Sequence, residues 1–111
     1  KIYEIVLKAQ NLALREAKEN VLISKVDGAA RQFIAESGYG RRFGHNLGHG
    51  VGLEIHELPS ISPKENSRLK SGMVFTIEPA IYLPDKLGIR IEDTVCLTPQ
   101  GCEVLSGSLH K

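Results

Sequence analysis

Apolar side chains recur at helical spacing in the first part of the chain. They stand at Ile2, Ile5, Val6, Ala9, Leu12 and Ala13, where they would form one stripe along a helix. Glu4 and Lys8 lie one turn apart on the polar side, with the acid first, which adds slightly to helix stability. The pattern predicts an amphipathic helix over residues 2–18, and Asn20 is expected to end it.

A second helix is expected to run to about Ser37. Ser24-Lys25-Val26-Asp27 resembles a capping box, with the hydroxyl of Ser24 as the N-cap group. Gly38 follows as the natural residue just beyond the C-terminal end, because glycine adopts the left-handed backbone conformation that often ends a helix. The buried face is predicted to hold Ala30, Phe33 and Ile34.

After Gly40 the pattern changes to that of strands and loops. The strand candidates are Val51–Glu57, Met73–Leu83, Gly88–Thr98 and a short last strand at Glu103–Leu105. Residues 59–71 are polar and carry two prolines, so they are expected to form a loop. Two helices followed by antiparallel strands predict an α+β fold.

The composition fits one small domain. The chain has 111 residues, of which 41% are hydrophobic and 24% charged, and its net charge of +1 gives no reason to expect nucleic acid or an anionic membrane as a partner. No apolar run reaches the length of a membrane span. The start at Lys1, with neither Met nor signal peptide, suggests part of a longer protein. Cys96 and Cys102 show neither zinc-site spacing nor a disulfide framework, which predicts a cytoplasmic location.

Two glutamates face each other in the predicted hairpin. If the register is symmetric about Asp85, Glu78 lies directly opposite Glu92, with Cβ atoms roughly 5 Å apart. Two ionised carboxylates at that distance need a cation or a shared proton. Arg90 leaves the same face as Glu92 and is a candidate partner. The alternative is that Pro79 ends the strand and turns Glu78 toward solvent.

Three of the four histidines fall in one glycine-rich stretch, at His45, His49 and His56. Neutral imidazole is a common ligand of first-row transition metals. His49 and His56 are an odd number of residues apart, so a regular strand would place them on opposite faces, and a shared site requires a bulge at Gly50 or Gly52. The alternative is three ordinary surface or core histidines.

Three segments together resemble the signature blocks of the pita-bread metallopeptidase family, which includes methionine aminopeptidase, aminopeptidase P and prolidase. The segments are Gly44–Pro59, Phe75–Pro79 and Gly88–Thr98. The histidine pair in His45-Asn46-Leu47-Gly48-His49 is more similar to the Xaa-Pro-specific branch. The resemblance implies that residues 1–111 are half of a pita-bread fold, the C-terminal part of the catalytic domain, without the half that carries two aspartate ligands.

The resemblance also implies roles for particular residues. The metal ligands would be His49, Glu78 and Glu92, and Glu78 would also transfer protons. His56 would help stabilise the tetrahedral intermediate, while His45 and Arg90 would contact the substrate. Asp27, Asp85 and Asp93 are expected to be structural and not to replace the missing aspartates.

The implied reaction is hydrolysis of an N-terminal Xaa-Pro bond by water bound between two divalent ions, with manganese favoured over cobalt or zinc. Without the other half, the isolated chain is expected to bind at most one ion, weakly, and to have little activity. Its uncovered apolar surface and sheet edge predict self-association or pairing with the missing half. The alternatives are a non-catalytic, protein-binding relative and a methionine aminopeptidase.

Overall fold

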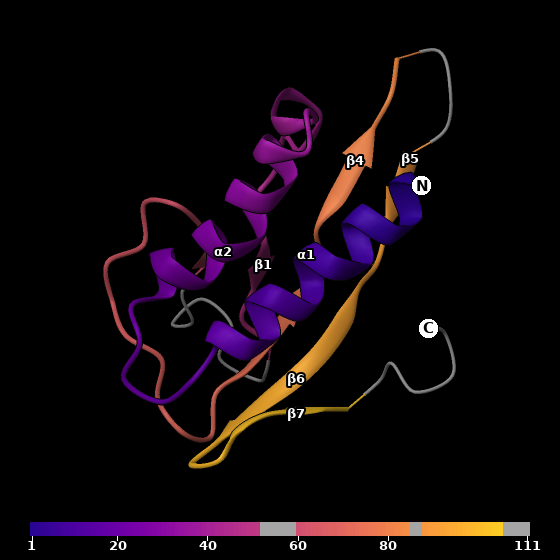
Figure 1. Cartoon of the computed structure of the whole chain (residues 1–111). Helices are drawn as coiled ribbons and strands as arrows, with labels where there is room; N and C mark the ends of the chain where they lie inside the picture. The colour runs from indigo at the N-terminus through magenta and orange to yellow at the C-terminus, as the bar shows by residue number, and fades with distance from the viewer. Residues whose placement is uncertain (52–59, 85–87, 106–111) are drawn as a thin grey trace.

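The computed structural model describes residues 1–51, 60–84 and 88–105. Its elements are α1 (Ile2–Glu16), α2 (Ile23–Glu36), a 3-10 turn η1 (Gly40–Arg42), β1 (Gly48–His49), β2 (Ser60–Ile61), β3 (Val74–Ile77), β4 (Ala80–Tyr82), β5 (Gly88–Arg90), β6 (Asp93–Thr98) and β7 (Gly101–Val104). α1 lies across one face of the strands, and α2 packs beside α1 (Figure 1). The α+β fold class is confirmed.

The first helix has the predicted amphipathic pattern but ends earlier than predicted. Val6, Ala9, Gln10 and Ala13 are buried, which agrees with the apolar stripe except at the polar Gln10. The chain leaves helical geometry at Ala17, so the prediction that the helix extends to Lys18 is wrong. Asn20 lies beyond the helix with a positive φ of 75°, and its amide donates to the carbonyl of Leu69. These tertiary contacts, which the local pattern does not contain, determine where the chain turns.

The second helix begins before the predicted cap. Leu22 is the N-cap residue and no side chain caps the helix, so the assignment of Ser24 as N-cap is wrong. The amides of Ile23 and Ser24 donate instead to backbone carbonyls in residues 65–67, at 2.9 and 3.0 Å. The orphan donors of the first turn are thus satisfied by a loop distant in sequence.

The C-terminal end of α2 agrees with the prediction. Gly38 has a φ of 96°, and its amide donates to the carbonyl of Ala35. The amide of Tyr39 reaches back to the carbonyl of Ile34 at 3.0 Å. These two bonds form a Schellman motif, in which the left-handed glycine closes the helix.

The predicted hairpin is present, but each of its strands is split in two. β3 pairs with β6, where Ile77 lies opposite Asp93, and β4 pairs with β5, where Ala80 lies opposite Arg90. Both pairs share the predicted register, although residues 85–87 of the turn lie outside the described residues. The split falls at Pro79, which has no N–H to donate to a ladder.

The remaining strands are short and lie around this hairpin. β1 pairs with β2, and Gly50, which follows β1, forms a bridge with Phe75 of β3. β2 lies in the segment predicted to be a loop, and β7 begins two residues before the predicted last strand. The predicted strand at Val51–Glu57 falls mainly on residues outside the described ranges. No helix among the described residues is long and apolar enough to cross a membrane.

The core lies between the inner faces of the two helices and the strands. Its largest fully buried apolar side chains include Ile23, Ile34, Leu47, Ile61, Leu69, Phe75, Ile77, Ile81 and Leu97. In β6 the buried positions alternate with half-exposed ones, which is the pattern of a strand with one face on the core. The core thus supports β3 and β6 from the helix side, which leaves their far face for the candidate site.

Candidate metal centre

Glu78 occupies the gap between β3 and β4. Its amide donates to the carbonyl of Leu47 at 2.7 Å, which ties the gap to the residue before β1. Only 13% of its side chain is exposed. The alternative in which Glu78 points to solvent is therefore wrong, although the strand does end before Pro79.

The hydroxyl of Thr76 orients this carboxylate. Thr76 Oγ1 donates to Oε2 of Glu78 at 2.7 Å and accepts a hydrogen bond from the amide of His49 at 3.0 Å. Thr76 is buried and was not predicted as a site residue. The signal was available, because residues two apart on a strand leave the same face, and a hydroxyl there can reach the carboxylate.

His49 meets Glu78 from β1. Its Nε2 lies 3.4 Å from Oε2 of Glu78, and 62% of the side chain is exposed. Its Nδ1 lies 3.0 Å from the carbonyl of Gly50. A carbonyl can only accept, so Nδ1 carries the hydrogen, and in the neutral ring Nε2 has the lone pair. Such a ring presents to Glu78 the nitrogen that a metal ion would bind.

Arg90 lies between the two predicted acidic ligands. Its Nη1 is 3.9 Å from Oε1 of Glu78, and its Nε is 3.8 Å from Oε1 of Glu92. Glu92 is 46% exposed, so it is far more open to water than Glu78. These contacts agree with the expectation that the Arg90 side chain leaves the same face as Glu92, and they are longer than hydrogen bonds.

These residues lie in one region of the structure, but they do not form a complete metal coordination site. Among the described residues, no three His, Cys, Asp or Glu side chains form a group around a single point. The guanidinium of Arg90 lies within 4 Å of a carboxylate oxygen of both Glu78 and Glu92. The donor types, one imidazole nitrogen and two carboxylates, nevertheless fit a divalent metal ion.

His45 lines a pocket beside these residues. Its ring packs edge-on against Phe43 and Tyr82, with centroids 5.1 and 6.1 Å away. Its Nε2 is buried and has no hydrogen-bond partner among the described residues. The pocket has a volume of about 420 Å³ and is lined by His45, Asn46, Gly48, His49, Ser60, Glu78 and Arg90. His56 lies outside the described residues.

A buried ion pair holds the loop that carries the two histidines. Arg31 donates to both carboxylate oxygens of Asp27, at 2.8 and 3.0 Å. The same guanidinium donates to the carbonyls of Phe43 and His45, at 3.2 and 2.9 Å. Oδ2 of Asp27 also accepts a hydrogen bond from the amide of Leu47. Arg31 was not predicted to act here, because the sequence alone does not place the loop against α2.

The aspartates within the described residues have the expected structural positions. Asp27 is fully buried in this ion pair. Asp93 is buried on the core side of β6, whereas Glu92 is half-exposed. Asp85 lies outside the described residues.

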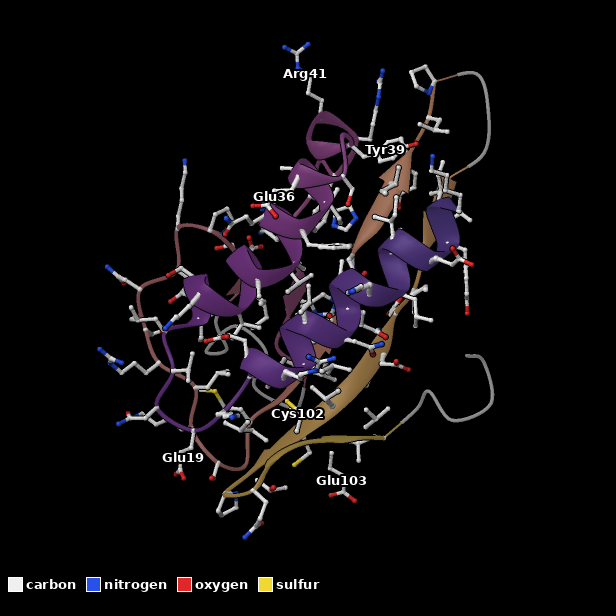
Figure 2. All side chains as sticks on the ribbon, viewed as in Figure 1. Glu19, Glu36, Tyr39, Arg41, Cys102 and Glu103 are labelled. Carbon is white, nitrogen blue, oxygen red and sulfur yellow. The ribbon has the colours of Figure 1, made fainter. Side chains whose placement is uncertain are left out.

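The two cysteines lie away from the pocket and both are free thiols. Cys102 lies beneath the C-terminal end of α1, and Glu103 points the other way (Figure 2). The Sγ of Cys102 donates to the carbonyl of Ala17 at 3.4 Å. Burial, with a smaller contribution from Cys96, raises the pKa of Cys102 from 9.0 to about 11.

Comparison with known proteins places the chain in a family. Residues 1–99 match the model of metallopeptidase family M24. The chain is 51% identical over 105 residues to an Xaa-Pro dipeptidase of Pyrococcus horikoshii, covering 95% of this chain and 30% of that protein. It is 54% identical over 105 residues, with the same coverage, to an Xaa-Pro dipeptidase of Pyrococcus furiosus. The chain therefore spans about 30% of the length of the curated relatives that it matches.

Solved structures of similar proteins lead to the same family. The crystal structure of an X-Pro aminopeptidase from Thermotoga maritima is 53% identical, with a TM-score of 0.88, and the match covers 96% of this chain and 31% of that one. An Xaa-Pro dipeptidase from Bacillus anthracis is 44% identical, with a TM-score of 0.90 and coverage of 96% and 30%. On the family match over residues 1–99 and these likenesses, the chain belongs to metallopeptidase family M24.

Proposed function

We propose that the chain is part of a metal-dependent peptidase that hydrolyses the bond between an N-terminal residue and a following proline. The observation that carries the proposal is the approach of His49 Nε2 to the carboxylate of Glu78 at 3.4 Å, inside a pocket. Relatives named Xaa-Pro dipeptidase and X-Pro aminopeptidase support the substrate class.

His49, Glu78 and Glu92 are the proposed metal ligands. The complete enzyme would hold two divalent ions, with manganese favoured by mainly oxygen ligands and one imidazole. Bound metal would supply an acidified water as nucleophile and a positive charge for the developing oxyanion. The tautomer of His49 and the fixed carboxylate of Glu78 support this assignment, because both groups present lone pairs without further rearrangement.

Glu78 is also the proposed proton carrier. The hydroxyl of Thr76 holds one of its oxygens at 2.7 Å, so the carboxylate keeps one orientation while it takes a proton from water and gives it to the leaving amine. Its low exposure supports this role, because proton transfer is more effective where competing water is limited.

The pocket residues are proposed to orient the peptide. Arg90 brings a positive charge that a peptide carboxylate or carbonyl can bind. His45 offers a buried ring nitrogen that has no hydrogen-bond partner among the described residues. His56 is proposed to stabilise the tetrahedral intermediate.

The chain is proposed to work with a further segment. Its relatives are about three times as long, and two further aspartate ligands are proposed to lie in the part that this chain does not match. Alone, the chain would bind at most one divalent ion, weakly, and would self-associate or pair with that segment. Its two free thiols support a cytoplasmic location.

The test is hydrolysis by the full-length protein with Mn²⁺, using an Xaa-Pro dipeptide, a longer Xaa-Pro peptide and a peptide with N-terminal Met. Cleavage of an Xaa-Pro substrate that is lost in Glu78→Gln supports the proposal, and substrate length separates dipeptidase from aminopeptidase. Cleavage of the Met peptide alone would indicate a methionine aminopeptidase. Absence of all cleavage would favour a non-catalytic relative.

A further inference from the structure

A polar side chain is buried on the apolar face of α1. Gln10 has no exposed surface, and the other buried residues of this helix are Val6, Ala9 and Ala13. Buried amides are usually held by hydrogen bonds, because an unpaired polar group is unfavourable away from water. The partners of Gln10 therefore indicate why a polar residue occupies this position.

The amide nitrogen of Gln10 spans the two strands of the hairpin. Nε2 donates to the carbonyl of Ile77 at 3.2 Å and to that of Ile91 at 3.4 Å. An amide nitrogen carries two hydrogens, one for each carbonyl. Ile77 directly precedes Glu78, and Ile91 directly precedes Glu92. One side chain thus holds the backbone immediately before both acidic residues.

The two sides of the hairpin need a further connection between β3 and β4, because the ladder of backbone hydrogen bonds is interrupted there. Pairing ends at Ile77 opposite Asp93 and resumes at Ala80 opposite Arg90. Within the gap, the amide of Ile91 donates to the carbonyl of Pro79 at 3.2 Å. Without a second tie, the two strands could separate or shift here, and the side chains of the two glutamates would move with them.

The amide oxygen of Gln10 indicates that the side chain does more than fill space. Oε1 of Gln10 is buried and has no hydrogen-bond partner among the described residues. An apolar residue of similar length would avoid that penalty. The two carbonyls also fix the orientation of the amide, because a flipped side chain would point an acceptor at two acceptors.

We propose that Gln10 is a positioning residue, which fixes the separation of Glu78 and Glu92 by tying the backbone before each of them to α1. The proposal rests on the proposed function for the roles of the two glutamates as ligands. On this proposal, the relative position of the two glutamate side chains is set by a helix on the opposite side of the hairpin.

The test compares Gln10→Met with Val6→Ala in the full-length protein. Methionine keeps the length and removes both donors, while Val6→Ala weakens the same buried face and touches no polar group. Hydrogen exchange of the metal-free proteins reports on the gap directly. We expect the amides of Glu78 and Ile91 to exchange about tenfold faster in Gln10→Met and at the wild-type rate in Val6→Ala, relative to amides elsewhere in each variant.

Calorimetric titration with Mn²⁺ provides the second readout. We expect Gln10→Met to weaken binding by roughly tenfold, in the range typical of residues that orient metal ligands, while Val6→Ala retains the wild-type affinity. Wild-type exchange at both amides in Gln10→Met, or equal changes in the two variants, would overturn the proposal. Failure of the wild-type protein to bind Mn²⁺ would overturn the proposed function, and the exchange measurement would still decide the role of Gln10.

Discussion

The Nε2 atom of His49 lies 3.4 Å from Oε2 of Glu78, although His49 lies in β1 and Glu78 lies in the gap between β3 and β4, which belong to other sheets. Two contacts hold them together: the hydroxyl of Thr76, and the hydrogen bond from the amide of Glu78 to the carbonyl of Leu47. The pair is therefore fixed by backbone and by a buried side chain, and its geometry should respond to substitutions that disturb those supports.

Thr76→Val tests the hydroxyl. Valine has nearly the same shape but leaves the amide of His49 and the carboxylate of Glu78 without their shared partner. We expect a loss of about 1 to 2 kcal/mol in the free energy of unfolding and Mn²⁺ binding weakened about tenfold, measured by calorimetry. Thr98→Val is the matched control, because the hydroxyl of Thr98 bonds to the backbone of Gln100 and Gly101 at the turn between β6 and β7. Equal Mn²⁺ affinity in both variants would contradict this role of Thr76.

Gly48→Ala tests the close approach of β1 to β3. A Cβ at Gly48 would overlap the backbone carbonyl of Thr76, which cannot move aside as a flexible side-chain end can. We expect destabilisation by about 1 to 3 kcal/mol in chemical denaturation and loss of peptidase activity in the full-length protein, because His49 moves with its strand. At Gly44 an added Cβ meets nothing within 4 Å. Gly44→Ala should therefore be nearly neutral, and similar effects of both substitutions would count against the explanation.

Arg31→Ala tests the ion pair beneath the histidine loop. It leaves the fully buried carboxylate of Asp27 without a positive charge, with only the amide of Leu47 among the described residues as a donor, and frees the carbonyls of Phe43 and His45. We expect a loss of about 3 kcal/mol in the free energy of unfolding, measured by urea denaturation. The control is Lys25→Ala, which removes an exposed contact with Glu16 and should change stability by less than about 0.5 kcal/mol. A loss for Arg31→Ala as small as that of the control would be inconsistent with a structural ion pair.

Cys102 gives a prediction for high pH. Its pKa is raised from 9.0 to about 11, so the folded chain keeps the thiol protonated while the unfolded chain ionises. The unfolded state then binds fewer protons, and stability should fall as pH rises from 9 to 11. Cys102→Ala should flatten that decline in thermal denaturation scans at several pH values. An equally steep decline in the variant would show that another group is responsible.

The sequence predicted the register of the acidic hairpin better than the contacts that support it. Glu78, Glu92 and Arg90 were placed together by the hairpin register, which depends on local alternation and a short turn. The contact between His49 and Glu78 was available only through the resemblance, since the glycines around His49 leave its backbone path open. Gln10 is not part of the apolar stripe predicted for α1. Nothing in the neighbouring sequence indicates that its amide reaches two distant carbonyls.

The ends of the helices and strands were also predicted less well, because some of them depend on contacts with residues distant in the sequence. The start of α2 is set by carbonyls of residues 65–67, and the break between β3 and β4 by the missing N–H of Pro79. The sequence does indicate Pro79 as a possible end of the strand, whereas it does not contain the loop contacts. Capping at Ser24 is a sound local expectation that a tertiary contact overrides.

The most direct test of the central claim is a crystal structure of the full-length protein with Mn²⁺, read through the anomalous scattering of the metal. We expect an anomalous peak bound by Nε2 of His49 and by carboxylate oxygens of Glu78 and Glu92. A peak elsewhere, or none at saturating Mn²⁺ with both glutamates still directed at Arg90, would contradict the assignment.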